Sequence, residues 1–287
     1  MGPRYAALAM ACCWIGVAPI LIRASDVDPQ TSLWLRMLIA TAVLAAFRGP
    51  RRPVSSGVRF RLLVASLAFA IDILAFHLAA VRTSVANTAV LAQIAPLIVA
   101  PLGYLLFGER QSLGGIVGLL GAFAGTVLLT GSGPSGSLVG NGLAALGGVS
   151  YAAYLLITKG LAERIAPARM VLWNCVVTAL VVTPLALAGG APTLPHSARG
   201  WLVIAAMAFG CQLLGHGLVV YAVERLPASF TANALLTPPV LSAAAALLLF
   251  HELPSPLQLI GAVLVLAGLA LATRHGLASE GAGRGSD

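Results

Sequence analysis

Long apolar segments, separated by short polar connections, recur along the whole 287-residue chain. Most of these segments approach the length of about 20 mostly apolar residues that a helix needs to cross a bilayer. The pattern predicts an all-α integral membrane protein with ten transmembrane helices. The predicted spans cover residues 5–22, 31–47, 60–81, 84–107, 112–130, 139–158, 168–187, 200–222, 228–250 and 256–273.

The basic residues indicate how these spans are oriented. With the N-terminus in the cytoplasm, thirteen of the 17 Lys and Arg residues fall on the cytoplasmic side, three fall in outer loops, and Arg36 lies inside a span. Membrane proteins carry an excess of Lys and Arg in their cytoplasmic loops. We therefore expect a multi-pass protein of the bacterial inner membrane, with both termini cytoplasmic. The net charge of +8 is a topology signal on this interpretation, and we expect no nucleic-acid partner.

The second half of the chain resembles the first. Pro96 aligns with Pro239 and Glu109 aligns with Glu252, both at a separation of 143 positions, and the sequences around these pairs also match. A looser match pairs an aromatic residue early in each half. Repetition at a fixed offset indicates that the chain contains two copies of one structural unit.

These copies predict the domain organisation. We expect an N-terminal five-helix repeat at residues 1–133, a second five-helix repeat at 139–274, and a disordered cytoplasmic tail at 275–287. Because five is an odd number, the second repeat enters the membrane from the opposite side. Two inverted five-helix repeats are common among secondary transporters, which bind substrate near the bilayer midplane between their halves.

In each copy a proline-containing helix ends in Phe-x-Glu and a glycine-rich span follows. This arrangement resembles the drug/metabolite transporter (DMT) superfamily, and in particular its ten-span branch with two EamA-type repeats. Within that branch the layout resembles amino-acid exporters of the YddG type. The resemblance covers nearly the whole chain, with a departure at His251, where a glycine such as Gly108 is usual. It implies export of small metabolites, most of all amino acids, by alternating access.

Polar residues at membrane depth are candidate substrate or coupling groups, because they are costly in hydrocarbon. His77 can bind a substrate carboxylate or carry a proton, or it can hydrogen-bond to a neighbouring helix. Gln212 and His216 lie four residues apart, so they share a helix face and form a second candidate pair. Asp72 has either a structural role, in an ion pair with Arg36 or a helix-end hydrogen bond, or it binds a proton or an amine through its carboxylate.

Further candidates lie in spans four and nine and in the matched aromatic pair. Gln93 and Pro96 lie on one face of span four, where they line either a helix contact or the pathway. Pro238 and Pro239 fall in the middle of span nine. Because proline removes an amide donor and kinks a helix, we expect these prolines and Pro96 to form a hinge.

Trp14 and Tyr151 are the matched aromatic residues of the two repeats, and either line a vestibule or pack between helices. The GxxxG pairs that begin at Gly114 and Gly121 favour close helix packing, within the chain or between protomers. We expect Glu109 and Glu252, at helix ends, to cap neighbouring helix N-termini rather than to bind substrate.

The composition excludes several classes of protein. Fifty-nine per cent of residues are apolar and 9% are charged, against about 45–50% and about 25% in soluble domains. The four cysteines lie in apolar runs without metal-ligand spacing, and no phosphate-binding loop for ATP is present. We therefore expect no metal, no cofactor and no enzymatic activity.

The function that remains is a secondary transporter of amphipathic substrates. It would act as a monomer or weak homodimer in the lipid bilayer. Efflux of drugs or lipophilic cations is the main alternative, and a channel or a membrane scaffold is a weaker one.

Overall fold

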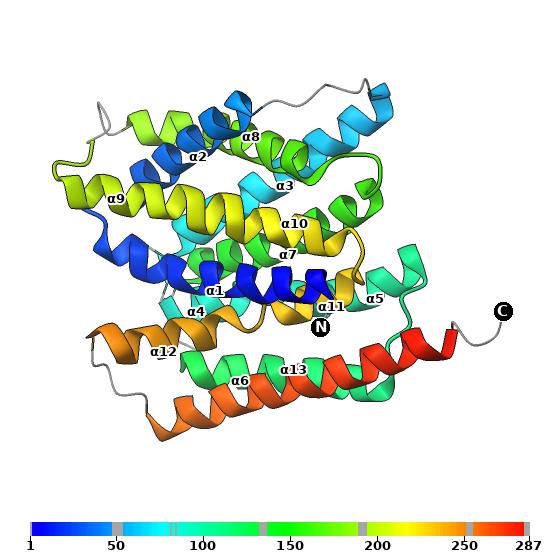
Figure 1. The fold of residues 1–287 in the computed structure, drawn as a ribbon. Helices are drawn as coiled ribbons and strands as arrows, with labels where there is room; N and C mark the ends of the chain where they lie inside the picture. The colour runs from blue at the N-terminus through cyan, green and yellow to red at the C-terminus, as the bar shows by residue number, and fades with distance from the viewer. Residues whose placement is uncertain are drawn as a thin grey trace.

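The computed structural model describes residues 2–47, 54–80, 82–83, 85–131, 137–188, 194–250 and 255–283, and all regular structure in these residues is helical. Figure 1 shows the helices side by side in a bundle, with the start of α1 and the end of α13 toward the same side. The helices are α1 (Pro3–Ala24), α2 (Pro29–Ala46), α3 (Ser56–Ala80), α4 (Val85–Ala92), α5 (Ala95–Phe107), α6 (Leu113–Thr130), α7 (Leu138–Leu161), α8 (Pro167–Ala188), α9 (Ala198–Ala206), the π-helix η1 (Met207–His216), α10 (Gly217–Val223), α11 (Ala228–Ala234), α12 (Pro238–Phe250) and α13 (Pro256–Gly283).

Among the described residues, seven helical stretches are long and apolar enough to cross a membrane. They are Pro3–Ile22, Ser56–Ala79, Asn87–Phe107, Leu113–Thr130, Leu138–Leu161, Pro167–Ala188 and Ala198–Val223. Each of the ten predicted spans falls on one helix or on consecutive helices. Because α2, α11, α12 and α13 lie outside those seven stretches, the count of ten spans stays a prediction.

Short polar side chains set where several helices begin. The Asp28 carboxylate accepts a hydrogen bond from the Thr31 amide at the start of α2. Serine does the same at the first turns of α6, α7 and α9, where Ser112, Ser137 and Ser197 accept from the amide three residues on. These caps satisfy amide donors that have no partner within the helix.

Glycines bring α6 and α13 into backbone contact. A Cβ atom added to Gly118 would lie 2.5 Å from the carbonyl oxygen of Gly268, and one added to Gly125 would lie 2.6 Å from that of Gly261. Gly118 and Gly261 are equivalent in the two repeats, and so are Gly125 and Gly268. The contacts are therefore reciprocal, as a twofold relation between repeats produces. The glycine packing joins the two repeats of one chain.

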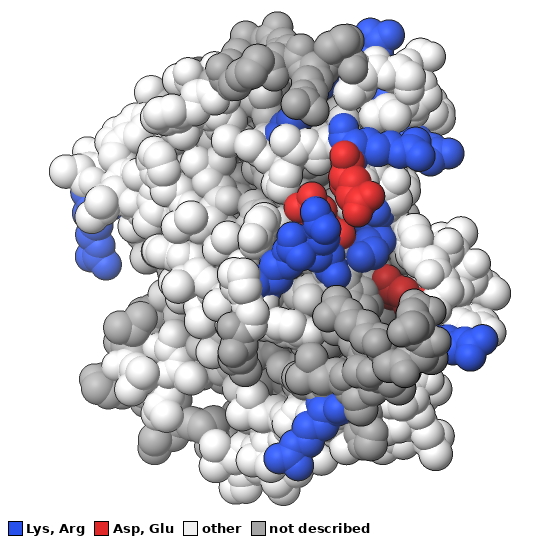
Figure 2. Space-filling model, turned by 45° about the vertical axis from the view of Figure 1, so that its right-hand side comes forward, with Lys and Arg blue, Asp and Glu red and all other residues white. Residues whose placement is uncertain are grey.

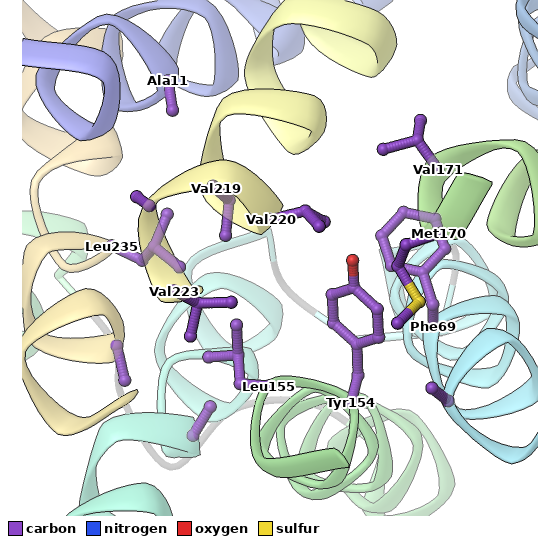
Figure 3. Close-up of a cluster of buried hydrophobic side chains, with 14 of the residues drawn as sticks. Ala11, Phe69, Tyr154, Leu155, Met170, Val171, Val219, Val220, Val223 and Leu235 are labelled. Atoms are coloured by element: carbon purple, nitrogen blue, oxygen red, sulfur yellow. The ribbon is translucent and has the colours of Figure 1, made fainter. Parts of the chain in front are cut away.

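The central core forms where helices from both repeats meet. Tyr154 and Leu155 of α7 lie among Val219, Val220 and Val223 of α10, and Figure 3 shows this cluster beside Phe69 of α3 and Met170 of α8. All are almost fully buried. Burying this much apolar surface stabilises the packing of α7 and α10 against α3 and α8.

The outer surface is largely apolar. Leu105, Leu138 and Leu202 each expose more than two thirds of their surface, and Figure 2 shows wide areas without a described charged residue, with most of the charged side chains in view gathered in one region. An apolar surface of this extent is unusual for a protein surrounded by water. A multi-pass membrane protein explains it.

The C-terminal segment differs from the predicted disordered tail. Helix α13 continues past Arg274 to Gly283, so residues 275–283 are helical. Leucine, alanine and glutamate in this stretch favour helix and extend the preceding span, which explains the difference. Residues 284–287 of the predicted tail lie outside the described part of the chain.

Candidate functional site

Two of the predicted spans are interrupted near their middle. Span 84–107 divides into α4 and α5 at residues 93–94, and span 228–250 divides into α11 and α12 at residues 235–237. In each case proline occupies one of the first two positions of the second helix. Proline is tolerated there because amides in the first turn have no intrahelical partner.

A hydrogen bond joins one interruption to the other. The Gln93 side chain donates through Nε2 to the carbonyl oxygen of Leu235, at 3.0 Å. The helix breaks start within three residues of Pro96 and Pro238, the prolines expected to act as a hinge. The two helix breaks thus lie where the hinge was expected. Movement at these breaks, including at Pro239, stays a prediction.

The first helix of each repeat packs on the broken span of the other. A Cβ atom at Gly16 of α1 would lie 3.1 Å from the Pro238 carbonyl oxygen, and Ser242 of α12 donates a hydrogen bond to the Gly16 carbonyl oxygen at 2.5 Å. A Cβ atom at Gly148 of α7 would lie 2.8 Å from the Leu91 carbonyl oxygen, at the end of α4. The two repeats therefore interlock around the helix breaks.

Arg36 of α2 lies inside the bundle, with 6% of its surface exposed. Residues of three other elements lie within electrostatic range of its guanidinium: His77 of α3, Cys175 of α8, and Cys211 and His216 of η1. Gln212, which is fully buried, approaches Cys175 with Nε2 3.5 Å from Sγ. We call Arg36, these four residues and Gln212 the Arg36 cluster.

Three polar atoms of the Arg36 cluster are buried without a hydrogen-bond partner among the described residues. They are Nε of Arg36, Oε1 of Gln212 and Nδ1 of His216. Within the described part of the chain, no carboxylate forms an ion pair with the Arg36 guanidinium. Buried polar groups in proteins almost always have partners, so three such atoms in one cluster make it a candidate place for a ligand or water to bind.

Asp72 lies on another face of α3. Its Oδ1 would be 3.4 Å from a Cβ atom at Gly147 of α7, and its carboxylate interacts electrostatically with Tyr151 and Tyr154 of the same helix. We call Asp72 and these two tyrosines the Asp72 cluster. No ion pair joins Asp72 to Arg36 in the structure, although this pair was one of the arrangements that the sequence suggested. Helix geometry explains this, because Asp72 and His77 point about 140° apart on α3 and His77 is the one near Arg36.

A polar chain that the sequence analysis missed supports Tyr154. Asn174 donates through Nδ2 to the Tyr154 hydroxyl at 2.9 Å, and its Oδ1 accepts from the Ser66 hydroxyl at 3.0 Å. All three residues are buried. Asn174 is a polar residue within an apolar helix, so the test that selected Asp72 would also have selected it.

The remaining predicted site residues are placed as follows. The Nδ1 atom of His77 bonds the carbonyl oxygen of Ile73 in its own helix at 2.7 Å. The indole of Trp14 packs on Gly210 of η1, where any side chain would collide with the ring. His216 contacts the Phe69 ring, with 4.9 Å between ring centroids. The π-helix that carries Gln212 and His216 was not foreseen, and such segments are frequent at functional sites.

A separate cavity of about 310 Å³ lies at the end of the bundle near the α5–α6 connection. Its lining includes Glu109, Gln111, Phe230 and Asn233. The Asn233 and Gln111 side-chain oxygens are buried without a partner among the described residues. The sequence analysis did not single out either residue, and this cavity lies apart from the Arg36 cluster.

Glu109 joins the two repeats at the same end of the bundle. Its carboxylate accepts hydrogen bonds from the amides of Ala228 and Ser229, at 2.8 and 3.1 Å, and from the Ser229 hydroxyl at 2.9 Å. The chain reaches this position through Gly108, whose φ of +68° ends α5 in the left-handed conformation that glycine adopts readily. The prediction that Glu109 caps a helix is confirmed, whereas Glu252 lies outside the described residues.

The fold and the site define a class of protein: a multi-pass helical membrane protein with two repeats and, at their interface, a polar cluster with three buried atoms that have no hydrogen-bond partner among the described residues. The model of the EamA-like transporter family matches residues 3–131 and 138–274. The chain therefore belongs to the EamA-like transporter family of the DMT superfamily. Members of this family are transporters rather than enzymes.

Two individual proteins are similar to this chain. A protein of Streptantibioticus cattleyicolor named "Probable terminal-alkyne amino-acid exporter" is 28% identical over 253 residues, which cover 84% of this chain and 83% of the relative. A solved crystal structure matches with a TM-score of 0.82 at 21% identity, covering 94% of this chain and 97% of that one. At this identity the structural match shows the fold alone.

Proposed function

We propose that the chain is a ten-span secondary transporter of the bacterial inner membrane that exports small amphipathic metabolites, amino acids foremost. Both termini are cytoplasmic, and residues 1–133 and 139–274 form inverted halves. The observation that carries the proposal is the Arg36 cluster, whose buried polar atoms lie without partners between the two repeats in the described part of the chain. A carrier needs such unsatisfied groups, because its substrate must exchange hydrogen bonds with water for hydrogen bonds with protein. The printed name of the S. cattleyicolor relative supports amino acids as substrates.

In this proposal the substrate binds between the broken helices and η1. His77, Gln212 and His216 supply polar contacts, Gln93 lies at the helix breaks, and Trp14 and Tyr151 line the pathway. The pathway wall around these groups is apolar, with Phe69 and the side chains of α10 nearby. An amphipathic substrate with a small polar head fits this combination.

Alternating access would use the two helix breaks. The buried cluster of Tyr154, Leu155, Val219, Val220 and Val223 packs α7 against α10 (Figure 3). We assign it as the cytoplasmic gate. To open it, α10 and α11 would move away from α7, with the residues before Pro96 and Pro238 as hinges.

The Asp72 cluster favours a second candidate function. A carboxylate beside two tyrosine rings is chemically suited to a cationic ligand, through ion pairing and cation–π contacts. If Asp72 binds the substrate rather than a proton, efflux of lipophilic cations becomes the better assignment. Both functions use the same fold and differ in the cluster that binds the substrate.

Uptake into liposomes that contain only the purified protein tests the proposal. We expect saturable uptake of some radiolabelled amino acids from a panel, and comparison with and without a pH gradient shows whether protons are coupled. Loss of a neutral hydrogen bond is worth about 0.5–1.5 kcal/mol, so His77→Ala and Gln212→Leu should each lower kcat/KM by about 2- to 12-fold. His196→Ala is the matched control, since His196 is exposed outside the bundle.

The outcomes separate the alternatives. Flux of lipophilic cations without amino-acid uptake would replace amino-acid export by drug efflux. Flux that does not saturate would indicate a channel, and absence of any flux would reject transport. Equal activity of His77→Ala, Gln212→Leu and the control would reject the assigned substrate contacts.

A further inference from the structure

Arg36 carries a charge that the described part of the protein does not neutralise. The described side chains in electrostatic range of the guanidinium are imidazoles and thiols, and none of them is a carboxylate. Asp72, which also lies at membrane depth, interacts with Tyr151 and Tyr154 instead. Charged groups inside a membrane normally pair with one another or face a functional cavity.

The second repeat carries a neutral residue at the position that corresponds to Arg36. Aligning α2 and α8 by their first residues pairs Arg36 with Asn174, and aligning their Leu-Trp pairs at 33–34 and 172–173 pairs it with Cys175; both candidates are neutral. The Asn174 amide bonds both Tyr154 and Ser66, so it is satisfied within the protein. Arg36 in the first repeat differs, because its Nε has no partner among the described residues. A purely structural role therefore explains Asn174 but not Arg36.

The polar atoms without partners around Arg36 indicate the chemistry of a ligand that would bind there. The guanidinium offers hydrogen-bond donors in a planar fork, which matches the two oxygens of a carboxylate. The Gln212 Oε1 atom is an acceptor without a donor in the described part of the chain. A small molecule that carries a carboxylate next to a hydrogen-bond donor satisfies both, and α-amino acids and α-hydroxy acids have this arrangement.

We infer that Arg36 binds the carboxylate of the transported substrate, with Gln212 accepting a hydrogen bond from its α-substituent. This inference rests on the proposed transport function and deepens it, because it selects carboxylate-bearing substrates over lipophilic cations. It also separates the roles of the two clusters: the Arg36 cluster binds the substrate anion, and the Asp72 cluster is left for the amine end of a longer substrate or for a proton.

The test measures discrimination between matched substrates rather than activity alone. Liposomes that contain the purified protein take up a radiolabelled amino acid that the wild type transports. Competition is then measured with the same amino acid unlabelled, with its carboxamide, and with the decarboxylated amine. We compare the wild type with Arg36→Lys, Arg36→Gln and Arg36→Met, and use Arg199→Gln as the control for loss of an exposed positive charge.

We expect the wild type and Arg199→Gln to be inhibited by the amino acid and hardly at all by its amide or amine. From the strength of hydrogen bonds to charged groups, Arg36→Gln and Arg36→Met should bind the carboxylate about 10- to 150-fold more weakly and lose the preference over the carboxamide. Arg36→Lys should keep the preference with reduced affinity.

The outcomes that overturn the inference leave the proposed function separately testable. If Arg36→Met, shown to be folded by its melting temperature, keeps the wild-type ratio of carboxylate to carboxamide inhibition, Arg36 does not bind the carboxylate although transport stands. Should the variants not fold, ligand-induced thermal stabilisation of the wild type decides, and equal stabilisation by acid and amide would overturn the inference. Failure of the wild type to transport any amino acid or hydroxy acid would instead reject the proposed function.

Discussion

Replacing Gly125 with alanine tests the contact that joins the two repeats. The added Cβ atom would lie 2.6 Å from the Gly261 carbonyl oxygen and 2.7 Å from the Val265 amide nitrogen, both in the backbone of α13. Ordinary contacts of a Cβ atom begin near 3.4 Å. Since backbone atoms cannot rotate away, α6 and α13 must separate locally by about 0.8 Å, the difference between 3.4 and 2.6 Å. Overpacking of this kind costs about 1–3 kcal/mol.

The same helix offers a matched control. Gly121 lies one turn earlier in the same GxxxG pair, and a Cβ atom there would meet nothing within 4 Å. Alanine is about 0.8–1.0 kcal/mol more favourable than glycine within a helix. Gly121→Ala should therefore be neutral or stabilising, while Gly125→Ala is destabilising.

Thermal unfolding of both variants in the same detergent or nanodisc measures the difference. With about 2–4 °C per kcal/mol for a chain near this size, Gly125→Ala should melt about 2 to 12 °C below the wild type. Gly121→Ala should melt at or above the wild-type temperature. If Gly125→Ala is as stable as Gly121→Ala, the close approach of α6 and α13 is not a feature of the folded protein.

Three further substitutions test contacts that the structure places inside the bundle, each followed by the melting temperature. Glu109→Ala removes a charged acceptor from three hydrogen bonds and should cost about 1.5–3 kcal/mol, whereas the same change at exposed Glu163 should have no effect. Gln93→Leu leaves the Leu235 carbonyl without its donor and should cost about 1–3 kcal/mol; unchanged stability would mean that the two helix breaks are not joined there. Asn174→Leu should cost a similar amount, and it should leave the carboxylate preference of transport intact, which would distinguish it from the Arg36 variants.

The helices could be predicted from the sequence because local features determine them. Apolar segments of spanning length, prolines at helix starts and serine caps act within a few residues, and the predicted segments coincide with the helices of the structure. The prediction that Glu109 caps a helix also followed from local information, because a carboxylate at the end of one helix interacts favourably with the N-terminus of a neighbouring helix. The prediction that the tail is disordered from residue 275 was wrong, because its glycines were taken as a sign of disorder although α13 continues to Gly283.

The site was predictable only in part. The rule that polar residues in hydrocarbon are functional selected His77, the pair Gln212 and His216, and Arg36 together with Asp72. The structure brings Arg36, His77, Gln212 and His216 into one cluster. The sequence analysis overlooked Asn174, although the same rule applies to it. The π-helix at 207–216 was not foreseen; it packs on Trp14 of α1 through Gly210, a contact between segments far apart in the sequence.

The sequence by itself determined the membrane class, the repeat and the approximate place of each span, because hydropathy and repetition are properties of the linear chain. Only the tertiary structure decided which polar residues share a site. The helical period places Asp72 on the side of α3 near Tyr151 and His77 on the side near Arg36. Gly125 and Gly261 set how closely the two repeats approach. These relations depend on the direction of side chains and on packing between segments far apart in the sequence, and the order of residues alone specifies neither.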